Sequence, residues 1–339
     1  MSVIDELYDY AHDHRILLSL TIELTTLCNE QCIHCYIPNH DNKGMDIETV
    51  KRAIKEFRDL GGLNLTLTGG EIFLRKDIFE IIEYARSLHI RVFLLTNATL
   101  LTEENVKKLK KLNIAELSIS VYSLENHIHD YITNREGSCE KTLNAIDMAI
   151  RNGISVTVKT PLIEKNKYSY KDLKKYCFDK KINYIASCII FSKSDGDSSV
   201  KDLIINENDK KNIAKDVEKM EPNGRRNYYD EACGSLKYTL AIDASGNVFP
   251  CNSFYYKLGN VYSNTLEEIW NSMALKNIQE IRKNELSECT SCVYKKRCSR
   301  CPGLAYLEDN TLYGCSSTAR ENVQSMVCYQ CNQGACNGK

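Results

Sequence analysis

The stretch LSLTIELTTLCNEQCIHC, residues 18–35, joins an expected β-strand to three closely spaced cysteines. Its first seven residues alternate between apolar and polar side chains and are rich in β-formers, which predicts a strand. Cys28, Cys32 and Cys35 follow this strand, with His34 among them. Three thiols are an odd number for disulfides and one fewer than a closed tetrahedral metal site requires. The missing fourth ligand is therefore the feature that the function has to explain.

The composition limits the classes to which this chain of 339 residues can belong. Its 44 basic and 45 acidic residues give a formal net charge of −1, so neither nucleic acid nor a membrane surface is an expected partner. No stretch approaches the roughly 18 apolar residues of a membrane span, and the acidic N-terminus lacks the apolar segment of a signal peptide. We therefore predict a cytoplasmic protein, in which thiols stay reduced. Metal ligation is then the leading explanation for its sixteen cysteines.

A strand–helix pattern repeats along roughly the first 200 residues. In the first predicted helix, Asp46 is the expected N-cap and Gly61 the expected end. Six strand–helix units of this kind predict an α/β fold with a parallel sheet, either open or rolled into a partial barrel. Chemistry in such sheets gathers at the carboxyl ends of the strands. The predicted strands are residues 18–24, 63–68, 91–96, 115–121, 154–160 and 182–191, and the predicted helices are 46–62, 77–88, 102–112, 138–152 and 169–179.

Two kinds of metal site are compatible with the three-cysteine loop on its own. An iron–sulfur cubane usually takes four thiolates, so three would leave one iron free for another ligand. Alternatively, His34 or His40 would complete a zinc site. A second motif, TLTGGEIFLRKD, runs off the second predicted strand and brings Gly69, Gly70 and Glu71 to the same end of the sheet. Adjacent glycines let a backbone approach a ligand closely, and a neighbouring carboxylate can bind an ammonium group.

Together, these two motifs resemble those of the radical S-adenosylmethionine (SAM) superfamily, over roughly residues 15–192. The resemblance implies a partial (β/α)6 TIM-like barrel in which Cys28, Cys32 and Cys35 hold a [4Fe-4S] cluster. The free iron would chelate the amino and carboxylate groups of SAM, Glu71 and the glycine backbone would hold the ammonium, and His34 would lie near the adenine. Reductive cleavage of SAM would then give a 5′-deoxyadenosyl radical, which takes a hydrogen atom from a substrate C–H bond.

Further contacts with SAM follow from the same resemblance. LTNATLL, after the third predicted strand, resembles the family's Thr-Asn-Gly turn and assigns Asn97 to the cofactor, although Ala98 stands in the glycine position. Around the fourth predicted strand, Ser118 or Ser120 would contact the ribose. Arg135 would contact the carboxylate, and an ordinary surface salt bridge is an equal alternative for this arginine.

The C-terminal part of the chain holds a second group of cysteines. Their pattern resembles the SPASM extension of radical SAM peptide-modifying enzymes, which carries two auxiliary [4Fe-4S] clusters. Only two residues separate the last two cysteines of the central run, one fewer than in the commonest form of the pattern. A zinc ribbon formed by the two Cys-x2-Cys pairs is the alternative. By the resemblance, Cys233, Cys251 and Cys301 ligate the first auxiliary cluster, and Cys289, Cys292, Cys298 and Cys315 ligate the second.

The sequence leaves two questions about the cysteines unanswered. The first auxiliary cluster has three identified ligands, so either another cysteine completes it or one iron is open to substrate. Cys188, on the sixth predicted strand, is a candidate hydrogen-atom donor if it faces the barrel interior, with core packing as the alternative. The thiols of Cys328, Cys331 and Cys336 fall in a tail that is expected to be irregular.

The remaining predictions concern the organisation of the C-terminal part. We expect a helix at about 206–220, two strands around the turn Asp-Ala-Ser-Gly-Asn, and an amphipathic helix over residues 264–284. The expected division is a radical SAM barrel over residues 1–200, a linker and helix over 201–232, a SPASM domain over 233–320 and a cysteine-containing tail over 321–339.

The expected function is modification of a ribosomally synthesised precursor peptide, by a thioether or carbon–carbon cross-link, epimerisation or backbone excision. Sulfatase-maturing and tetrapyrrole-modifying enzymes share both cysteine fields and are alternatives. A non-catalytic iron–sulfur or zinc scaffold is a third, against which the Gly-Gly-Glu motif argues. Only some 17 residues precede the first strand, so we expect a separate protein to recognise the leader of the peptide, or leader recognition to be dispensable. An electron donor such as flavodoxin or ferredoxin is a further expected partner.

Overall fold

The computed structural model describes residues 3–217, 231–295, 298 and 300–331 of the chain. Its centre is a nine-stranded sheet with the strand order β6-β5-β4-β3-β2-β1-β7-β8-β9. The six predicted strands are present and pair in parallel with their neighbours in chain order. They are β1 (Ser19–Glu23), β2 (Asn64–Thr68), β3 (Arg91–Thr96), β4 (Glu116–Ser120), β5 (Val156–Pro161) and β6 (Asn183–Ser187).

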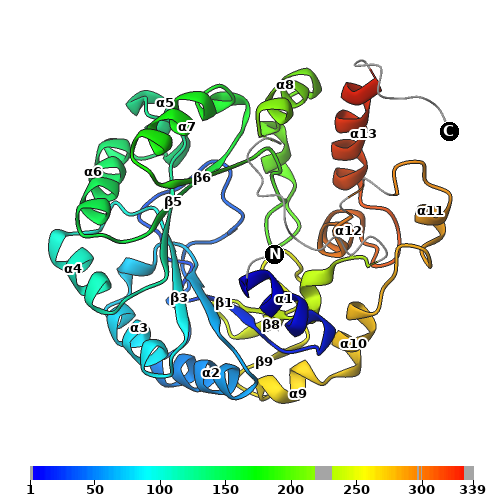
Figure 1. Cartoon of the computed structure of the whole chain (residues 1–339), viewed down its shortest axis with the longest axis horizontal. Coiled ribbons are helices and arrows are strands. Elements are labelled where there is room, and N and C mark those ends of the chain that lie inside the picture. The colour runs from blue at the N-terminus through cyan, green and yellow to red at the C-terminus, as the bar shows by residue number, and fades with distance from the viewer. Residues whose placement is uncertain (1–2, 218–230, 296–297, 299, 332–339) are drawn as a thin grey trace.

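Helices follow the strands and form an arc around the outer face of the sheet (Figure 1). Asp46 caps the first of them as predicted, since its carboxylate accepts the amide hydrogen of Thr49, and Gly61 follows its end with a φ of +93°. α5 is not predicted by the sequence. The helices of this half are α2 (Ile47–Asp59), α3 (Ile78–Ser87), α4 (Glu103–Lys111), α5 (Asn126–Thr133), α6 (Ser138–Arg151) and α7 (Tyr170–Asp179), with short 3-10 turns η1 (Ile72–Leu74) and η2 (Glu164–Asn166).

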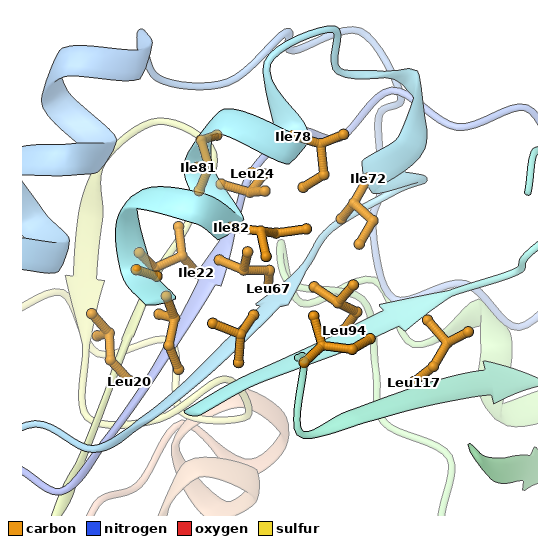
Figure 2. Close-up of a cluster of buried hydrophobic side chains, with 14 of the residues drawn as sticks. Leu20, Ile22, Leu24, Leu67, Ile72, Ile78, Ile81, Ile82, Leu94 and Leu117 are labelled. Carbon is orange, nitrogen blue, oxygen red and sulfur yellow. The ribbon is translucent and has the colours of Figure 1, made fainter. Parts of the chain in front are cut away.

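The main hydrophobic core lies between this arc of helices and the sheet. Figure 2 shows α3 laid across the strands, with Ile82 near Ile22 and Leu67, and all three belong to the same buried cluster. Alternate residues of each strand enter this core, so the remaining side chains point to the inner face of the sheet. The inner face is therefore left for polar residues and for the site.

The C-terminal part joins the same sheet. The predicted hairpin is formed by β7 (Thr239–Ile242) and β8 (Asn247–Phe249), which are antiparallel. β7 also pairs in parallel with β1, which the sequence does not predict, and β9 (Gly259–Asn260) pairs with β8. The other elements are η3 (Ser199–Leu203), α8 (Glu207–Val217), η5 (Gly234–Lys237), α9 (Leu266–Trp270), α10 (Met273–Gln279), α11 (Ser287–Thr290), α12 (Pro302–Asp309) and α13 (Ser317–Cys331).

Two predictions for this part are wrong. The segment 264–284 forms two helices, α9 and α10, rather than one, because the side chain of Ser272 caps a new helix start by accepting from the amide of Leu275. The tail is not irregular throughout, since α13 continues to Cys331. Cys336 lies outside the described residues.

A partly buried carboxylate, that of Glu231, links the N-terminal helix α1 (Val3–Asp13) to the C-terminal part. Glu231 accepts hydrogen bonds from His12 (2.7 Å), Lys237 (2.9 Å) and Arg282 (2.5 Å). Burial by itself raises the pKa of Glu231, but these hydrogen bonds outweigh burial and hold the pKa at about 2. Among the described residues, no helix is long and apolar enough to cross a membrane.

Candidate active site

The three-cysteine loop follows β1 at the carboxyl end of the sheet, where the sequence predicts it. A backbone hydrogen bond from the amide of Ile33 to the carbonyl of Ile132 (2.9 Å) fastens the loop to α5. Within the loop, the amide of Cys35 donates to the carbonyl of Cys32 (3.0 Å). The position of the thiols therefore depends on a helix that comes almost one hundred residues later in the chain.

The three thiols are partly buried and lie close together. Burial raises the pKa of Cys28 to about 11, and it also raises the pKa values of Cys32 and Cys35. The carboxylate of Glu30 adds to the effect on Cys28 and Cys32. Coordination to a metal reverses this preference, because a ligating thiol is deprotonated. The donor set fits a [4Fe-4S] cluster with one iron left for another ligand.

The geometry does not reproduce the zinc alternatives. Among the described residues, no three His, Cys, Asp or Glu side chains are arranged to hold a single metal ion. His40 instead forms a hydrogen bond with Cys35, at 3.5 Å between Nε2 and Sγ. In a cubane each thiolate binds a different iron, so its ligands need not converge on one point.

Gly69 and Gly70 bring the loop after β2 against the loop after β1. The amide of Gly70 donates to the carbonyl of Thr25, and the amide of Glu71 donates to the carbonyl of Leu27, both at 2.8 Å. A Cβ atom on either glycine would lie 2.2 Å from one of these carbonyl oxygens. Gly69 also has a φ of +136°, which favours glycine. The two glycines thus permit a close backbone approach that positions the residue before Cys28.

The side chain of Glu71 differs from the sequence expectation. It is fully buried and does not line the cavity described below. Its carboxylate accepts from the hydroxyl of Thr96 (2.7 and 2.8 Å) and from the amides of Asn97 (2.9 Å) and Phe73 (3.0 Å). Burial nevertheless raises the pKa of Glu71. In this arrangement the carboxylate forms hydrogen bonds with the turn after β3. It does not face the cavity in which an ammonium group would bind.

The turn after β3 supports the cysteine loop from the opposite side. The side-chain amide of Asn97 donates to Oδ1 of Asn29 (2.9 Å) and lies 3.9 Å from Sγ of Cys28. Ala98 has a φ of +64° and is buried. The position that resembles a family glycine therefore does adopt the left-handed conformation, although alanine occupies it.

A cavity of about 320 Å³ opens between these loops and the inner face of the sheet. Asn252, Ser253 and Tyr255 of the C-terminal part line it as well, so its wall is shared by both halves of the chain. The predicted site residues that line the cavity are Cys28, Cys32, Cys35, His34, Gly69, Gly70, Asn97, Ser118 and Ser120.

His34 has the environment of an uncharged ligand-contacting group. Its ring packs edge-to-face against Tyr122, with ring centroids 4.9 Å apart. Nδ1 is buried without a hydrogen-bond partner in the described part of the chain. Burial lowers the pKa of His34 to about 4, so the imidazole is neutral near pH 7.

Besides Glu71, two further residues predicted for this site, Arg135 and Cys188, lie outside the cavity wall. Arg135 is exposed and donates from Nη1 to the carbonyl of Asn29 (2.7 Å), so it holds the cysteine loop from outside. Cys188 packs in the cluster of Leu162, Tyr170, Ile205 and Ile213. The interpretation of Cys188 as a hydrogen donor facing the barrel interior is therefore wrong, because Cys188 follows the end of β6, packs against this cluster and does not line the cavity.

Lys159 is a further cavity residue, and the strand pattern around it carries a signal for its position. In ISVTVKT, Val156 and Val158 enter the outer core, so the alternation directs Lys159 to the inner face. Lys159 lines the cavity opposite Ser120 of β4 and has no hydrogen-bond or ion-pair partner within the described residues. Burial lowers the pKa of Lys159, and the charge of Glu116 opposes that shift.

The seven predicted cluster ligands of the C-terminal part form two groups of interacting thiols. Burial raises the pKa of Cys251 to about 12 and also those of Cys233 and Cys301, and these three thiols interact with one another. In the second group, the pKa values of Cys289 and Cys298 are likewise raised by burial, and both thiols interact with Cys292 and Cys315. The structure thus brings together the same two sets that the sequence assigns to two auxiliary clusters.

Comparison with known families agrees with both halves of the site. The family model of the radical SAM superfamily matches residues 22–177, and that of an iron–sulfur cluster-binding domain, SPASM, matches residues 233–302. The chain is a radical SAM enzyme with a SPASM domain. The resemblance of the sequence to radical SAM enzymes with a SPASM extension is thereby confirmed. The predicted fold class, a partial barrel with a cysteine-rich C-terminal domain, is confirmed as well.

Relatives of this radical SAM/SPASM enzyme have more than one activity. The antilisterial bacteriocin subtilosin biosynthesis protein AlbA of Bacillus subtilis (strain 168) is 29% identical over 331 residues, which cover 91% of this chain and 70% of AlbA. An AdoMet-dependent heme synthase of Methanosarcina barkeri is 25% identical over 323 residues, which cover 84% of this chain and 90% of the synthase.

Solved structures share the fold. SuiB of Streptococcus suis, bound to its precursor peptide SuiA, superposes with a TM-score of 0.74 at 18% identity and covers 93% of this chain and 79% of its own. The enzyme anSMEcpe with bound AdoMet superposes with a TM-score of 0.71 at 17% identity, covering 93% of this chain and 97% of its own.

Proposed function

We propose that this enzyme modifies a ribosomally synthesised peptide, with Cys28, Cys32 and Cys35 holding the SAM-binding cluster. Bound to a reduced [4Fe-4S] cluster, SAM supplies a carbon radical that removes hydrogen from an unactivated C–H bond. The backbone of Gly69 and Gly70, which lines the cavity, would border the cofactor. The auxiliary clusters would be held by the two C-terminal thiol groups described above.

The observation that carries the proposal is the shared wall of the cavity. The three-cysteine loop forms one side of it, and Asn252, Ser253 and Tyr255 form another, directly after the predicted ligand Cys251. A substrate side chain placed here would adjoin the three-cysteine loop on one side and the segment that follows Cys251 on another. The apolar residues Leu95, Ile189, Ile190 and Phe191 complete the wall and help to exclude water.

The charge of the cavity favours a peptide over a tetrapyrrole. Tetrapyrrole precursors carry several carboxylates and need several cations for recognition. Among the described residues that line the cavity, Lys159 is the one lysine or arginine, and the buried His34 is neutral. A peptide presents mainly neutral side chains and amides, which suit the hydroxyl and amide groups of this wall. The similarity to AlbA supports the same substrate class.

The wall also favours a net oxidation of the peptide, such as a cross-link, over epimerisation. Epimerisation requires a donor that returns a hydrogen atom, and a thiol is well suited to that step. The thiols that line the cavity in the described structure are the three predicted cluster ligands, since Cys188 packs elsewhere. The expected product is therefore a peptide that has lost two hydrogen atoms. One would go to the 5′-deoxyadenosyl radical, and the other would leave as a proton to solvent and an electron to an auxiliary cluster held by the C-terminal thiols.

Anaerobic reconstitution tests the proposal. The wild-type chain should bind about twelve irons, and it should form 5′-deoxyadenosine with SAM, a reductant and a candidate precursor peptide. Deuterium on the modified carbon should appear in the 5′-deoxyadenosine. The matched control is the variant in which Cys28, Cys32 and Cys35 are alanine, which should keep about eight irons and form no product.

The heme synthase relative defines the second candidate. Incubation with a carboxylate-bearing tetrapyrrole precursor in place of the peptide distinguishes the two. Consumption of the tetrapyrrole, without peptide-dependent 5′-deoxyadenosine, would refute the peptide proposal.

A further inference from the structure

Two buried cations lie beside the second auxiliary thiol group. Arg300 is 4% exposed and Lys283 is 8% exposed. The guanidinium of Arg300 donates from Nε to the carbonyl of Gly314 (2.9 Å) and from Nη2 to that of Leu312 (2.6 Å). Its Nη1 is buried and has no hydrogen-bond partner among the described residues. Lys283 donates from Nζ to the carbonyl of Cys298 (3.0 Å).

Neither cation is paired with a carboxylate within the described part of the chain. Arg300 instead interacts electrostatically with Cys289, Cys298 and Cys315 of the second group and with Cys301 of the first. Lys283 interacts with Cys289 and Cys298. Burying an unpaired charge is costly, so buried cations without carboxylates indicate an anionic partner. Neutral thiols do not supply that charge, whereas a cluster held by four thiolates is anionic.

We propose that Arg300 and Lys283 form a cationic support for the auxiliary cluster of Cys289, Cys292, Cys298 and Cys315, and that they raise its reduction potential. The two carbonyl contacts fix the guanidinium, so its third nitrogen is free to donate a hydrogen bond to a cluster or ligand sulfur. This inference rests on the iron–sulfur assignment of the proposed function.

The effect on the potential follows from charge. The reduced cluster carries one more negative charge than the oxidised cluster, so nearby buried cations stabilise the reduced form more strongly. Hydrogen bonds to the sulfurs act in the same direction. Arg300 also interacts electrostatically with Cys301, and in the sequence it lies between Cys298 and Cys301. We therefore expect a smaller effect of the same sign on the first auxiliary cluster.

The test measures potentials rather than turnover. The background is the full chain with Cys28, Cys32 and Cys35 replaced by alanine, so that only the auxiliary clusters contribute. Arg300→Met and Lys283→Met are introduced separately, reconstituted anaerobically and assayed for iron and sulfide. Redox titration followed by electron paramagnetic resonance then gives each potential. Each variant should shift the one-electron equilibrium at least tenfold toward the oxidised cluster, which is 59 mV.

Two further variants separate charge, hydrogen bonding and general surface effects. Arg300→Lys keeps the charge but loses the fixed third donor, so its shift should be smaller than that of Arg300→Met. Arg320→Met is the matched control. Arg320 forms a hydrogen bond with Cys315 and also interacts with Cys292, but its side chain is 53% exposed and lies 3.8 Å from the carboxylate of Glu288. Solvent and this carboxylate screen its charge, so Arg320→Met should shift the potential by clearly less than Arg300→Met.

The outcomes are distinguishable. Fully loaded Arg300→Met and Lys283→Met variants with unchanged potentials would overturn this inference alone. If Arg300→Met fails to load the cluster, the Arg300→Lys and Lys283→Met variants decide, and unchanged potentials in both would overturn it. A background protein that takes up no iron on these thiols would refute the iron–sulfur assignment itself.

Discussion

Replacing Gly70 with alanine should damage the cysteine loop through contact between two backbones. The new Cβ would lie 2.2 Å from the carbonyl oxygen of Leu27 and 2.6 Å from that of Thr26. Both atoms belong to the backbone, so no side-chain rotation relieves the clash. The two segments must separate, which weakens the hydrogen bonds from Gly70 to Thr25 and from Glu71 to Leu27.

The size of this effect can be estimated from the lost contacts. Each hydrogen bond contributes about 0.5–1.5 kcal/mol, and overpacking of this kind costs about 1–3 kcal/mol. We expect the free energy of unfolding to fall by about 3 kcal/mol. Because Leu27 precedes Cys28, the same displacement should move the thiol of Cys28, a predicted ligand. A binding site tolerates a displacement of its ligands of only about 0.5 Å. The iron content should therefore fall from about twelve to about eight per chain.

Gly137→Ala is the matched control. Gly137 has a φ of +71°, and nothing lies within 4 Å of a Cβ atom built there. Its replacement should cost about 1–2 kcal/mol through the left-handed backbone alone and should leave the iron content unchanged. Urea denaturation and iron assays of both variants provide the measurement. A Gly70→Ala protein with wild-type iron and a stability equal to that of Gly137→Ala would refute the role assigned to the close approach.

Three further predictions concern other buried groups. Thr96→Val should lower the free energy of unfolding by about 1–3 kcal/mol, because both oxygens of Glu71 lose the hydroxyl donor; an unchanged urea midpoint would contradict this. The folded-state pKa of Glu231 is about 2 against an ordinary 4.5, so its stabilisation is present above pH 4.5 and is lost as the pH falls toward 2. The stability difference between wild type and Glu231→Gln should shrink over that range, and a difference independent of pH would be inconsistent with it. Cys188→Ala should leave the product and its stereochemistry unchanged; loss of product in a folded variant would restore the hydrogen-donor role.

The strand–helix order of the barrel was accessible from the sequence because it depends on local patterns. Alternation in LSLTIEL and the caps at Asp46 and Gly61 are properties of a few neighbouring residues, and the structure reproduces them. The break in the segment 264–284 is also local, but its signal is weaker. The side chain of Ser272 caps the start of a second helix, so the first helix ends before it. Amphipathic periodicity alone does not reveal this break.

The site is partly predictable for the same reason. Cys28, Cys32 and Cys35 are contributed by one loop, so spacing alone brings them together. Glu71 shows the limit of that reasoning. Its place next to two glycines suggested a ligand contact, but the direction of its side chain depends on Thr96, at the end of β3, and on the backbone amide of Asn97 in the turn that follows.

The sequence by itself determined the order of strands and helices, the two cysteine fields and the family, because each is written in residues close together along the chain. Only the tertiary structure decided that β7 pairs with β1, that Lys159 lines the cavity while Cys188 packs elsewhere, and that Arg300 interacts with both C-terminal thiol groups. These facts depend on strand register and on contacts between distant segments. A shift of one residue in register reverses the face that a side chain occupies, and local sequence patterns do not record that choice.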